Sequence, residues 1–426
     1  MIIFLILSIP IVIFAYCNFK QTFIFYCGLK MIALSAMCIR YEPPALSMGT
    51  LLNAFFIFEF WRRGYFKGWR SRYRIFPLRT YFKLSLFSLL MSSIFTIVPD
   101  FGIITNDIMI IMDEYILVFM FWIFVNNIVD VRSFLNKAKW ILILVCLIGI
   151  VEFKTNVNLL TTFLQANVSP DLLFGKILDA GERLDARRVT SLFVSPNNFI
   201  YCAFVVLMIY MHNFYLKNKI SLFIPFLYLS IALIIMANSR TVLFSSLIIL
   251  FPIFLPNFSN IRSWIIVFSA IAVFFILKSS FDQYWINITS IFDYSSKNVS
   301  GSSTEMRVGQ LEASYELFKL SPIFGNGLHS IGYFTQTGDW GTKLFGTESI
   351  WFKLLIEKGI FGIIAYIYLF IELQKRYNIL NNKVLFFYTT GYLVANTMSS
   401  LPGFSMSFLY MGYFVMDIIK RNRQIA

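Results

Sequence analysis

Apolar residues dominate the chain in continuous runs of about 15 to 20 residues, and short polar segments separate these runs. The runs lack the alternation of apolar and polar positions that the strands of a membrane β-barrel show. Helices and closed barrels are the structures that satisfy all their backbone polar groups inside lipid. The pattern therefore predicts an all-α, polytopic integral membrane protein with about 12 to 13 transmembrane helices.

Two long polar segments, 154–195 and 279–347, divide the predicted spans into three groups. Spans before the first segment are expected at residues 2–17, 22–39, 45–60, 80–98, 108–129 and 140–153. Later spans are expected at 197–214, 222–237, 241–255, 263–277, 349–372, 384–400 and 403–419. Because no internal repeat or low-complexity linker is visible, we expect a single membrane domain over residues 1–426 with two large outer loops.

The composition supports this class: 14% of residues are charged, whereas soluble domains carry roughly 25%. The net charge of +14 does not indicate a nucleic-acid partner, because the cations are scattered between the apolar spans. More than half of the 36 Lys and Arg residues lie in short segments beside spans, which the positive-inside rule assigns to the cytoplasm. These segments are 18–21, 62–83, 130–139, 215–221, 256–262, 373–383 and the tail 420–426. The two long loops then face the outer side.

Arginines on the outer side run against this bias and therefore need a reason. Arg240 is the sharpest case, because it lies between two apolar runs with almost no loop between them. One interpretation is a side chain that reaches the lipid headgroups or forms an ion pair. The other is an anion site, because a guanidinium binds two phosphate oxygens and keeps its proton. Arg187, Arg188 and Arg307 fall on the same side.

A second cationic feature is expected where the first loop re-enters the membrane. Ser195 is a preferred N-cap residue and Pro196 is favoured at the first helical position, so a helix should begin there. The positive end of its dipole would face the outer side, where Arg187 or Arg188 could join it around an anion. Helix capping alone explains the same residues without a ligand.

The second loop is expected to contain an amphipathic helix, Thr304–Leu320, followed by a tight turn, Ser321–Gly327, because Pro and Gly end helices. Its apolar positions are expected to face membrane or protein, and its polar positions to share another face. The apolar positions are Met306, Leu311, Leu317 and Phe318, and the polar ones are Arg307, Gln310 and Ser314.

Few other residues suggest chemistry. Glu348 lies where the second loop re-enters the membrane, and it could cap a helix or act as a general base toward a hydroxyl. His329 is a candidate acid or base. No metal-ligand spacing, P-loop or dinucleotide-binding pattern is present, so we expect neither a metal nor a cofactor.

The order of these features resembles a known family. The segment Arg188–Asn197 is similar to the R-x-x-(G/S)-x-F-x-x-P-N signature of the bacterial O-antigen polymerase and O-antigen ligase superfamily. Ser239-Arg240 resembles the Ser-Arg pair that opens a following span in that family. Arg307 with the turn Ser321–Gly327, and the segment Glu348–Gly362, resemble its two later motifs. The resemblance covers residues 188–362.

The resemblance implies a sugar transferase of the bacterial inner membrane whose active site faces the periplasm. Its donor would be an oligosaccharide on undecaprenyl pyrophosphate, and arginines rather than a metal would stabilise the leaving pyrophosphate. It implies Glu348, Arg188, Arg240 and Arg307 as catalytic residues and Arg187, Asn197, Ser239 and His329 as substrate-binding residues. Arg187 could instead be an ion-pair partner of Glu182 or Asp185.

Three functions remain open. A polymerase joins lipid-linked repeat units, whereas an O-antigen ligase transfers finished glycan to the lipid A core. The ligase typically carries His where this chain has Glu348, which favours the polymerase. A lipid-linked oligosaccharide flippase should show internal symmetry, and none is visible. The expected partners are the lipid-linked oligosaccharide, membrane lipid and, for a polymerase, a chain-length regulator protein.

Overall fold

The fold is known from a computed structural model, which describes part of the chain. The described residues are 2–30, 38–40, 46–98, 102–167, 182–183, 186–187, 189–193, 236, 245, 248–249, 268, 304–328, 330–337, 341–344, 347, 349–380, 383–398 and 403–425. They are mostly helical, which confirms the helical class for this part of the chain. The number of transmembrane helices stays a prediction.

Two short antiparallel strand pairs were not predicted from the hydrophobic pattern. The pairs are β1 (Cys38–Arg40) with β2 (Leu46–Ser47) and β3 (Glu182–Arg183) with β4 (Ala186–Arg187). Strands of two or three residues are too short to show an alternation of apolar and polar positions. Their formation therefore depends on the partner strand rather than on a pattern in their own sequence.

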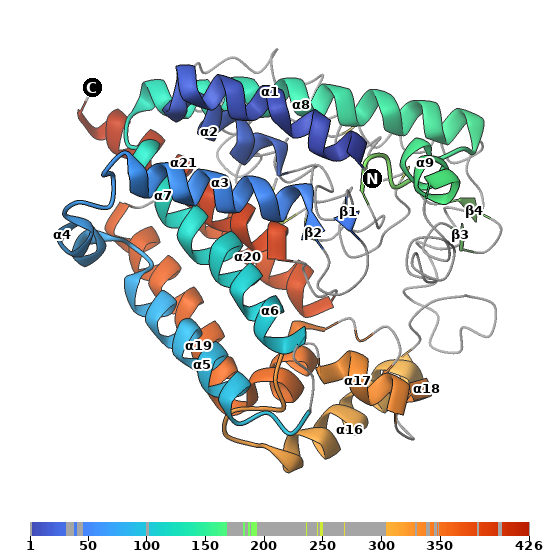
Figure 1. The fold of residues 1–426 in the computed structure, drawn as a ribbon. Helices are drawn as coiled ribbons and strands as arrows, with labels where there is room; N and C mark the ends of the chain where they lie inside the picture. Colours follow the sequence, from blue (N-terminus) through green and yellow to red (C-terminus); the bar gives the residue numbers. More distant parts are fainter. Residues whose placement is uncertain are drawn as a thin grey trace.

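The N-terminal helices lie together on one side of the molecule (Figure 1), and aromatic side chains pack between them. They are α1 (Ile2–Cys17), α2 (Phe19–Leu29), α3 (Met48–Arg62) and the long α8 (Ile128–Thr155), which ends beside α9 (Leu159–Asn167). The buried rings of Phe19 and Phe23 both contact Phe56 and Phe124. Edge-to-face and tilted aromatic packing of this kind fixes how α2, α3 and α7 (Leu117–Phe124) meet.

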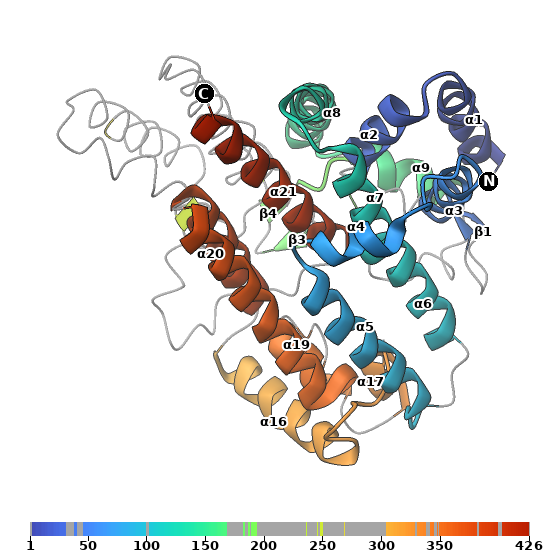
Figure 2. The ribbon, with the colours of Figure 1, turned by 90° about the vertical axis from the view of Figure 1, so that its left-hand side faces the viewer.

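A second group of helices lies beside the first, and Figure 2 shows α5 and α19 side by side within it. Its members are α5 (Arg79–Ile94), α6 (Gly102–Ile110), the π-helix η1 (Ile111–Ile116), α7 (Leu117–Phe124), α19 (Ile350–Leu380), α20 (Lys383–Met398) and α21 (Gly403–Ile425). The hydroxyls of Tyr81 and Tyr410 share a buried hydrogen bond of 2.8 Å. This bond pairs two buried polar atoms across α5 and α21.

Three shorter helices form a cap at one end of the molecule (Figure 1). They are α16 (Thr304–Leu320), α17 (Ser330–Thr337) and α18 (Gly341–Leu344). A small apolar core of Ala313, Leu317 and Leu344 joins them to Ile356 of α19. The second predicted outer loop is therefore folded against α19 over the residues that the structure describes.

Most predicted spans coincide with helices, but two boundaries are wrong. The predicted span 22–39 is wrong at its end, because α2 ends at Leu29 and residues 38–39 lie in β1. The predicted loop 130–139 is also wrong, because α8 already begins at Ile128, with the Asn127 side chain accepting the Asp130 N–H at 2.9 Å. Hydropathy marks the lipid-facing length of a helix and misses polar turns that extend beyond it. The predicted spans between 197 and 277 lie outside the described residues, apart from isolated positions.

Exposed apolar side chains form stripes along several helices. On α19 the stripe consists of Ile360, Ile364, Ile367 and Ile371, and on α8 it consists of Trp140, Leu144, Leu147 and Val151. Within the described residues, Ile128–Thr155 and Ile350–Lys375 are long and apolar enough to cross a membrane. Soluble monomers rarely expose apolar surface this continuous, whereas lipid-facing helices do.

Segments with the predicted cytoplasmic charge bias meet at one end of the molecule. Lys20 in the first turn of α2 forms a 2.7 Å ion pair with Asp130 of α8. The Arg63 guanidinium after α3 donates to the Ala15 carbonyl of α1 at 3.2 Å. In Figure 2, α4 (Trp69–Ile75) and the C-terminus lie toward this end, away from α16. We call it the basic end.

Candidate functional site

Two motifs that the sequence analysis singled out separately, the turn Ser321–Gly327 and the helix α19, are docked on each other. Backbone hydrogen bonds run from Asn326 to Ile356 (2.8 Å), from Gly327 to Glu357 (3.2 Å), from Ile360 to Pro322 (3.0 Å) and from Phe361 to Ile323 (3.3 Å). The N–H groups of both segments donate, so each segment satisfies backbone groups of the other. The turn thereby supports α19 at an internal kink.

Two glycines make this docking possible. Gly359 has φ 58° and ψ −154°, a region of backbone space that is essentially restricted to glycine. A Cβ atom on Gly359 would lie 2.7 Å from the backbone nitrogen of Gly325. A Cβ atom on Gly325, whose φ is 76°, would overlap the backbone of Glu357. The two backbones are in direct contact, and a side chain on either glycine would separate them.

Side chains at the end of α5 and just after it hold both the turn and α19. The Thr96 hydroxyl donates to the Asn326 carbonyl at 2.6 Å, and the Ser92 hydroxyl donates to the Glu357 carbonyl. The Phe324 ring stacks on Phe95 with centroids 5.0 Å apart. We call this assembly, comprising 92–96, 321–327 and 356–361, the motif junction. It fixes the second loop relative to two long helices.

The helix α16 covers the motif junction with a polar face. Its bounds, Thr304–Leu320, are as predicted. The apolar positions were expected to face membrane or protein, and Leu317 is buried while Leu311 is 48% exposed. The polar face is packed as well, because Gln310 and Ser314 are fully buried. The Ser314 hydroxyl donates to the Gln310 carbonyl at 2.6 Å. Small polar residues let α16 approach α19 closely, which a stripe of larger side chains would prevent.

Arg307 lies on the same helix, near its start, and its side chain is half-buried. Its guanidinium donates to the carbonyl of Met398, the last residue of α20, at 3.4 Å. The Trp351 indole of α19 donates to the hydroxyl of Thr397 at 3.1 Å. A cation is favoured at the negative end of a helix dipole, so this contact holds Arg307 where α16, α19 and α20 meet.

The segment that follows Arg188 is anchored to the end of α8. Glu152, which is 1% exposed, accepts the backbone N–H groups of Thr190 at 3.2 Å and Ser191 at 2.6 Å. A carboxylate that accepts several amide hydrogens holds a loop strongly. The sequence analysis overlooked Glu152, although a lone carboxylate in the apolar run 140–153 was a signal for it.

The same segment contacts the stretch that leads to Arg240. The backbone N–H of Val189 donates to the carbonyl of Met236 at 3.1 Å, and both residues are buried. Val189 directly follows Arg188 in the sequence, and Met236 shortly precedes Arg240. Two segments that flank predicted phosphate ligands are therefore neighbours in space.

Most of the predicted site side chains are not among those that the structure describes. Glu348, Arg188, Arg240, Asn197, Ser239 and His329 lie outside the described residues. Arg187 lies in β4, where the backbone register pairs it with Glu182, one of its expected ion-pair partners. Among the described residues, no group of three or more His, Cys, Asp or Glu side chains is placed to hold a metal ion.

A polar network inside the bundle joins α2, α3 and η1. Lys30 of the α2 terminus is 6% exposed and forms an ion pair with Asp113 of the π-helix η1. The same carboxylate accepts the Asn53 amide of α3 at 3.2 Å, and the Tyr26 hydroxyl donates to Asn53. Buried charges are costly unless paired, so this pair holds α2 and α3 against η1.

Residues 224–367 match a family model described as O-antigen ligase. Over this segment the chain is similar to the O-antigen ligase and polymerase superfamily. The O-antigen ligase match includes Arg240, Arg307, Glu348 and most of the motif junction, whereas Arg188 precedes it. No curated protein matched the chain. Members of the superfamily are membrane proteins that build surface polysaccharide, in line with the apolar stripes on α8 and α19.

Proposed function

We propose that the protein is a polymerase of surface-polysaccharide repeat units, a metal-independent glycosyltransferase of the inner membrane whose site faces the periplasm. A hydroxyl of a lipid-linked repeat unit attacks the sugar carbon that bears undecaprenyl pyrophosphate. A new C–O bond forms, the bond from that carbon to the pyrophosphate oxygen breaks, and undecaprenyl pyrophosphate leaves with the electron pair. Glu348 accepts the hydroxyl proton.

The observation that carries this proposal is the contact between Val189 and Met236. It makes neighbours of the segments that flank Arg188 and Arg240, which are the proposed ligands of the leaving pyrophosphate. Arg307 enters from the second loop as a third cation. Preplaced charge of this kind stabilises a leaving anion, and removing one such contact typically costs about 3 kcal/mol in the transition state.

The membrane arrangement is part of the same proposal. The apolar stripes on α8 and α19 support a multi-pass chain whose lipid-facing helices also contact the polyprenyl tail of the substrate. About 12 to 13 spans would place the motif junction and α16 on the outer side and the basic end in the cytoplasm. A chain-length regulator is a partner of the proposed polymerase.

The second candidate is an O-antigen ligase, because that is the printed description of the matching family model. Glu348 favours the polymerase, since the resemblance associates the ligase with His at this position. A flippase is the candidate from another class, and it lacks support from any internal repeat in the sequence.

A deletion strain distinguishes the three functions on a ladder gel of surface polysaccharide. A polymerase deletion leaves lipid A carrying single repeat units. A ligase deletion leaves lipid A without glycan while lipid-linked polymer accumulates, and a flippase deletion accumulates single lipid-linked units in the cytoplasm. Either of the last two patterns would overturn the proposal.

Variants of the two neighbouring arginines test the anion site in the same strain. Complementation with Arg188→Ala or Arg240→Ala should leave single repeat units although the protein inserts at normal levels. The matched control is Arg70→Ala, which removes a cation from the basic end. Normal ladders from both Arg188→Ala and Arg240→Ala would contradict the proposed pyrophosphate site.

A further inference from the structure

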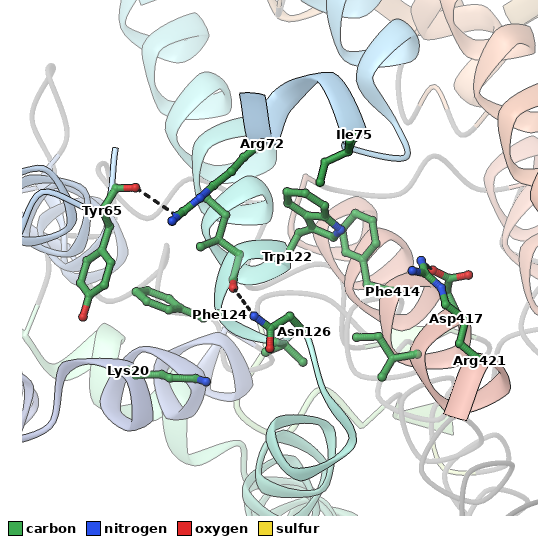
Figure 3. Close-up of a pocket in the computed structure, with 13 residues that line it drawn as sticks. Lys20, Tyr65, Arg72, Ile75, Trp122, Phe124, Asn126, Phe414, Asp417 and Arg421 are labelled. Carbon is green, nitrogen blue, oxygen red and sulfur yellow. Dashed lines mark hydrogen bonds and ion pairs between the residues drawn. The ribbon is translucent and has the colours of Figure 1, made fainter. Parts of the chain in front are cut away.

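A cleft of about 550 Å³ opens at the basic end of the molecule (Figure 3), and no residue of the motif junction lines it. Three cations from distant parts of the sequence line it: Lys20 of α2, Arg72 of α4 and Arg421 of α21. Figure 3 shows Arg72 and Lys20 reaching toward the cleft from opposite walls, with Arg421 at its far side. The transferase reaction uses none of these residues.

Each of the three cations keeps N–H donors that its observed partner does not use and that can bind an anion. Lys20 forms a 2.7 Å ion pair with Asp130, and Arg421 is paired with Asp417. Arg72 donates from one guanidinium nitrogen to the Tyr65 carbonyl at 3.3 Å. A lysine has three donors and an arginine five, so these contacts orient the side chains without exhausting their donors. The cleft therefore presents positively charged groups that are already fixed in place.

The rest of the lining is mostly apolar and aromatic, with Asn126 and the Asp417 carboxylate, which is paired with Arg421, among its polar members. Trp122 of α7, Phe414 of α21 and Ile75 of α4 line it, and Ile75 is 72% exposed. A small soluble anion would gain no binding energy from apolar and aromatic side chains. A phospholipid would, because its charged group can contact the cations while its glycerol backbone and acyl chains lie on the aromatic surface.

The short helix α4 has the character of a helix that lies at a membrane surface. Trp69 and Ile75 at its two ends are exposed, and Arg70, Arg72 and Arg74 alternate between them with no buried residue in the helix. Aromatic and apolar side chains insert at the headgroup level, while cations attract anionic lipids. The cleft thus lies at the depth where a phospholipid headgroup would be found.

We propose that this cleft binds the phosphate headgroup of one anionic phospholipid, with its acyl chains against Trp122 and Phe414. The recognised chemistry is a phosphodiester carried by an apolar body. The site is separate from the proposed transferase site and does not depend on the transferase reaction. The bound lipid would hold α4 against the ends of α2 and α21 when the surrounding membrane leaflet is rich in anionic lipid.

Arg72 offers the cleanest test, because its observed partner is a backbone carbonyl and its removal leaves no carboxylate unpaired. Arg70 is the matched control: it lies on the same helix and carries the same charge, but it does not line the cleft. The full-length protein, purified in detergent, is titrated with phosphatidylglycerol or phosphatidylcholine, and bound lipid is counted by native mass spectrometry.

Wild-type protein and Arg70→Gln should retain one phosphatidylglycerol and no phosphatidylcholine. Arg72→Gln should weaken phosphatidylglycerol binding about fivefold, the effect expected for one cation near an anionic headgroup. Arg72→Lys should recover most of the binding. Equal retention by Arg72→Gln and Arg70→Gln would overturn the proposal. Displacement of the lipid by millimolar inorganic phosphate would also overturn it, because it would show a site for a soluble anion.

Discussion

Gly325 and Gly359 meet backbone to backbone, so that a Cβ atom on Gly359 would lie 2.7 Å from the nitrogen of Gly325. The contact joins the second long loop to α19. It is also the point where two sequence motifs, separated by the whole of α17 and α18, become one structural unit.

Alanine at either glycine should disrupt the motif junction. Gly325→Ala and Gly359→Ala each combine a steric overlap with a positive φ, and overpacking of this kind costs about 1–3 kcal/mol before strain is added. We expect a lower melting temperature in detergent and loss of long-chain glycan. The controls are Gly309→Ala and Gly332→Ala, where a Cβ atom would meet nothing within 4 Å. Wild-type melting temperatures for both junction variants would refute this role.

Arg307 should be sensitive to a conservative change. Arg307→Lys keeps the charge but loses the planar fork that binds two phosphate oxygens, so we expect polymer formation to fall about 100-fold or more. The measurement is the initial rate of polymer formation from purified lipid-linked repeat units, with the melting temperature recorded alongside. A rate equal to wild type would show that Arg307 serves only to bind the end of α20.

Glu348 can be tested by two replacements that separate its alternative roles. Glu348→Gln keeps a side chain that can accept a hydrogen bond at the helix start but cannot take a proton, whereas Glu348→Ala removes both abilities. If Glu348 is the base, both variants lose polymer formation. Full activity in Glu348→Gln together with loss in Glu348→Ala would assign Glu348 to capping.

The buried pair Lys30 and Asp113 should matter for stability rather than for chemistry. Lys30→Met leaves the carboxylate without its cation inside the bundle, and breaking such a pair costs about 3–5 kcal/mol. Lys30→Met combined with Asp113→Asn should recover part of the loss in melting temperature. The control is Lys319→Gln, which breaks an exposed pair with Glu316 and should change stability little. Equal effects of the two lysine variants would contradict the structural role.

Local sequence signals predicted local structure well. The bounds of α16 were predictable because Pro322 and Gly325 follow it directly. The sequence did not reveal which face of α16 is packed, since the burial of Gln310 and Ser314 depends on α19, which lies beyond two further helices. The start of α8 was missed because its first turns are polar and hydropathy responds to lipid exposure.

The sequence identified candidate residues of the site, but it did not predict how they are arranged in space. Arginines at loop ends stand out by charge alone, and the family motifs place them in order. The contact of Val189 with Met236 joins positions far apart in the sequence, and no local pattern reports such a pairing. Glu152 was overlooked because an isolated carboxylate gives no sign of which amides it will bind.

The kink at Gly359 has a consequence for the rotational phase of α19. Residues before the kink turn toward α16 and the second loop, while Ile360, Ile364, Ile367 and Ile371 after it form the exposed stripe. Each residue of a regular α-helix is rotated by about 100° from the one before it. In a straight helix, the direction of the side chains before Gly359 would therefore determine the direction of those after it. The glycine uncouples them, so the residues before it face α16 and the second loop while the residues after it keep their apolar stripe exposed.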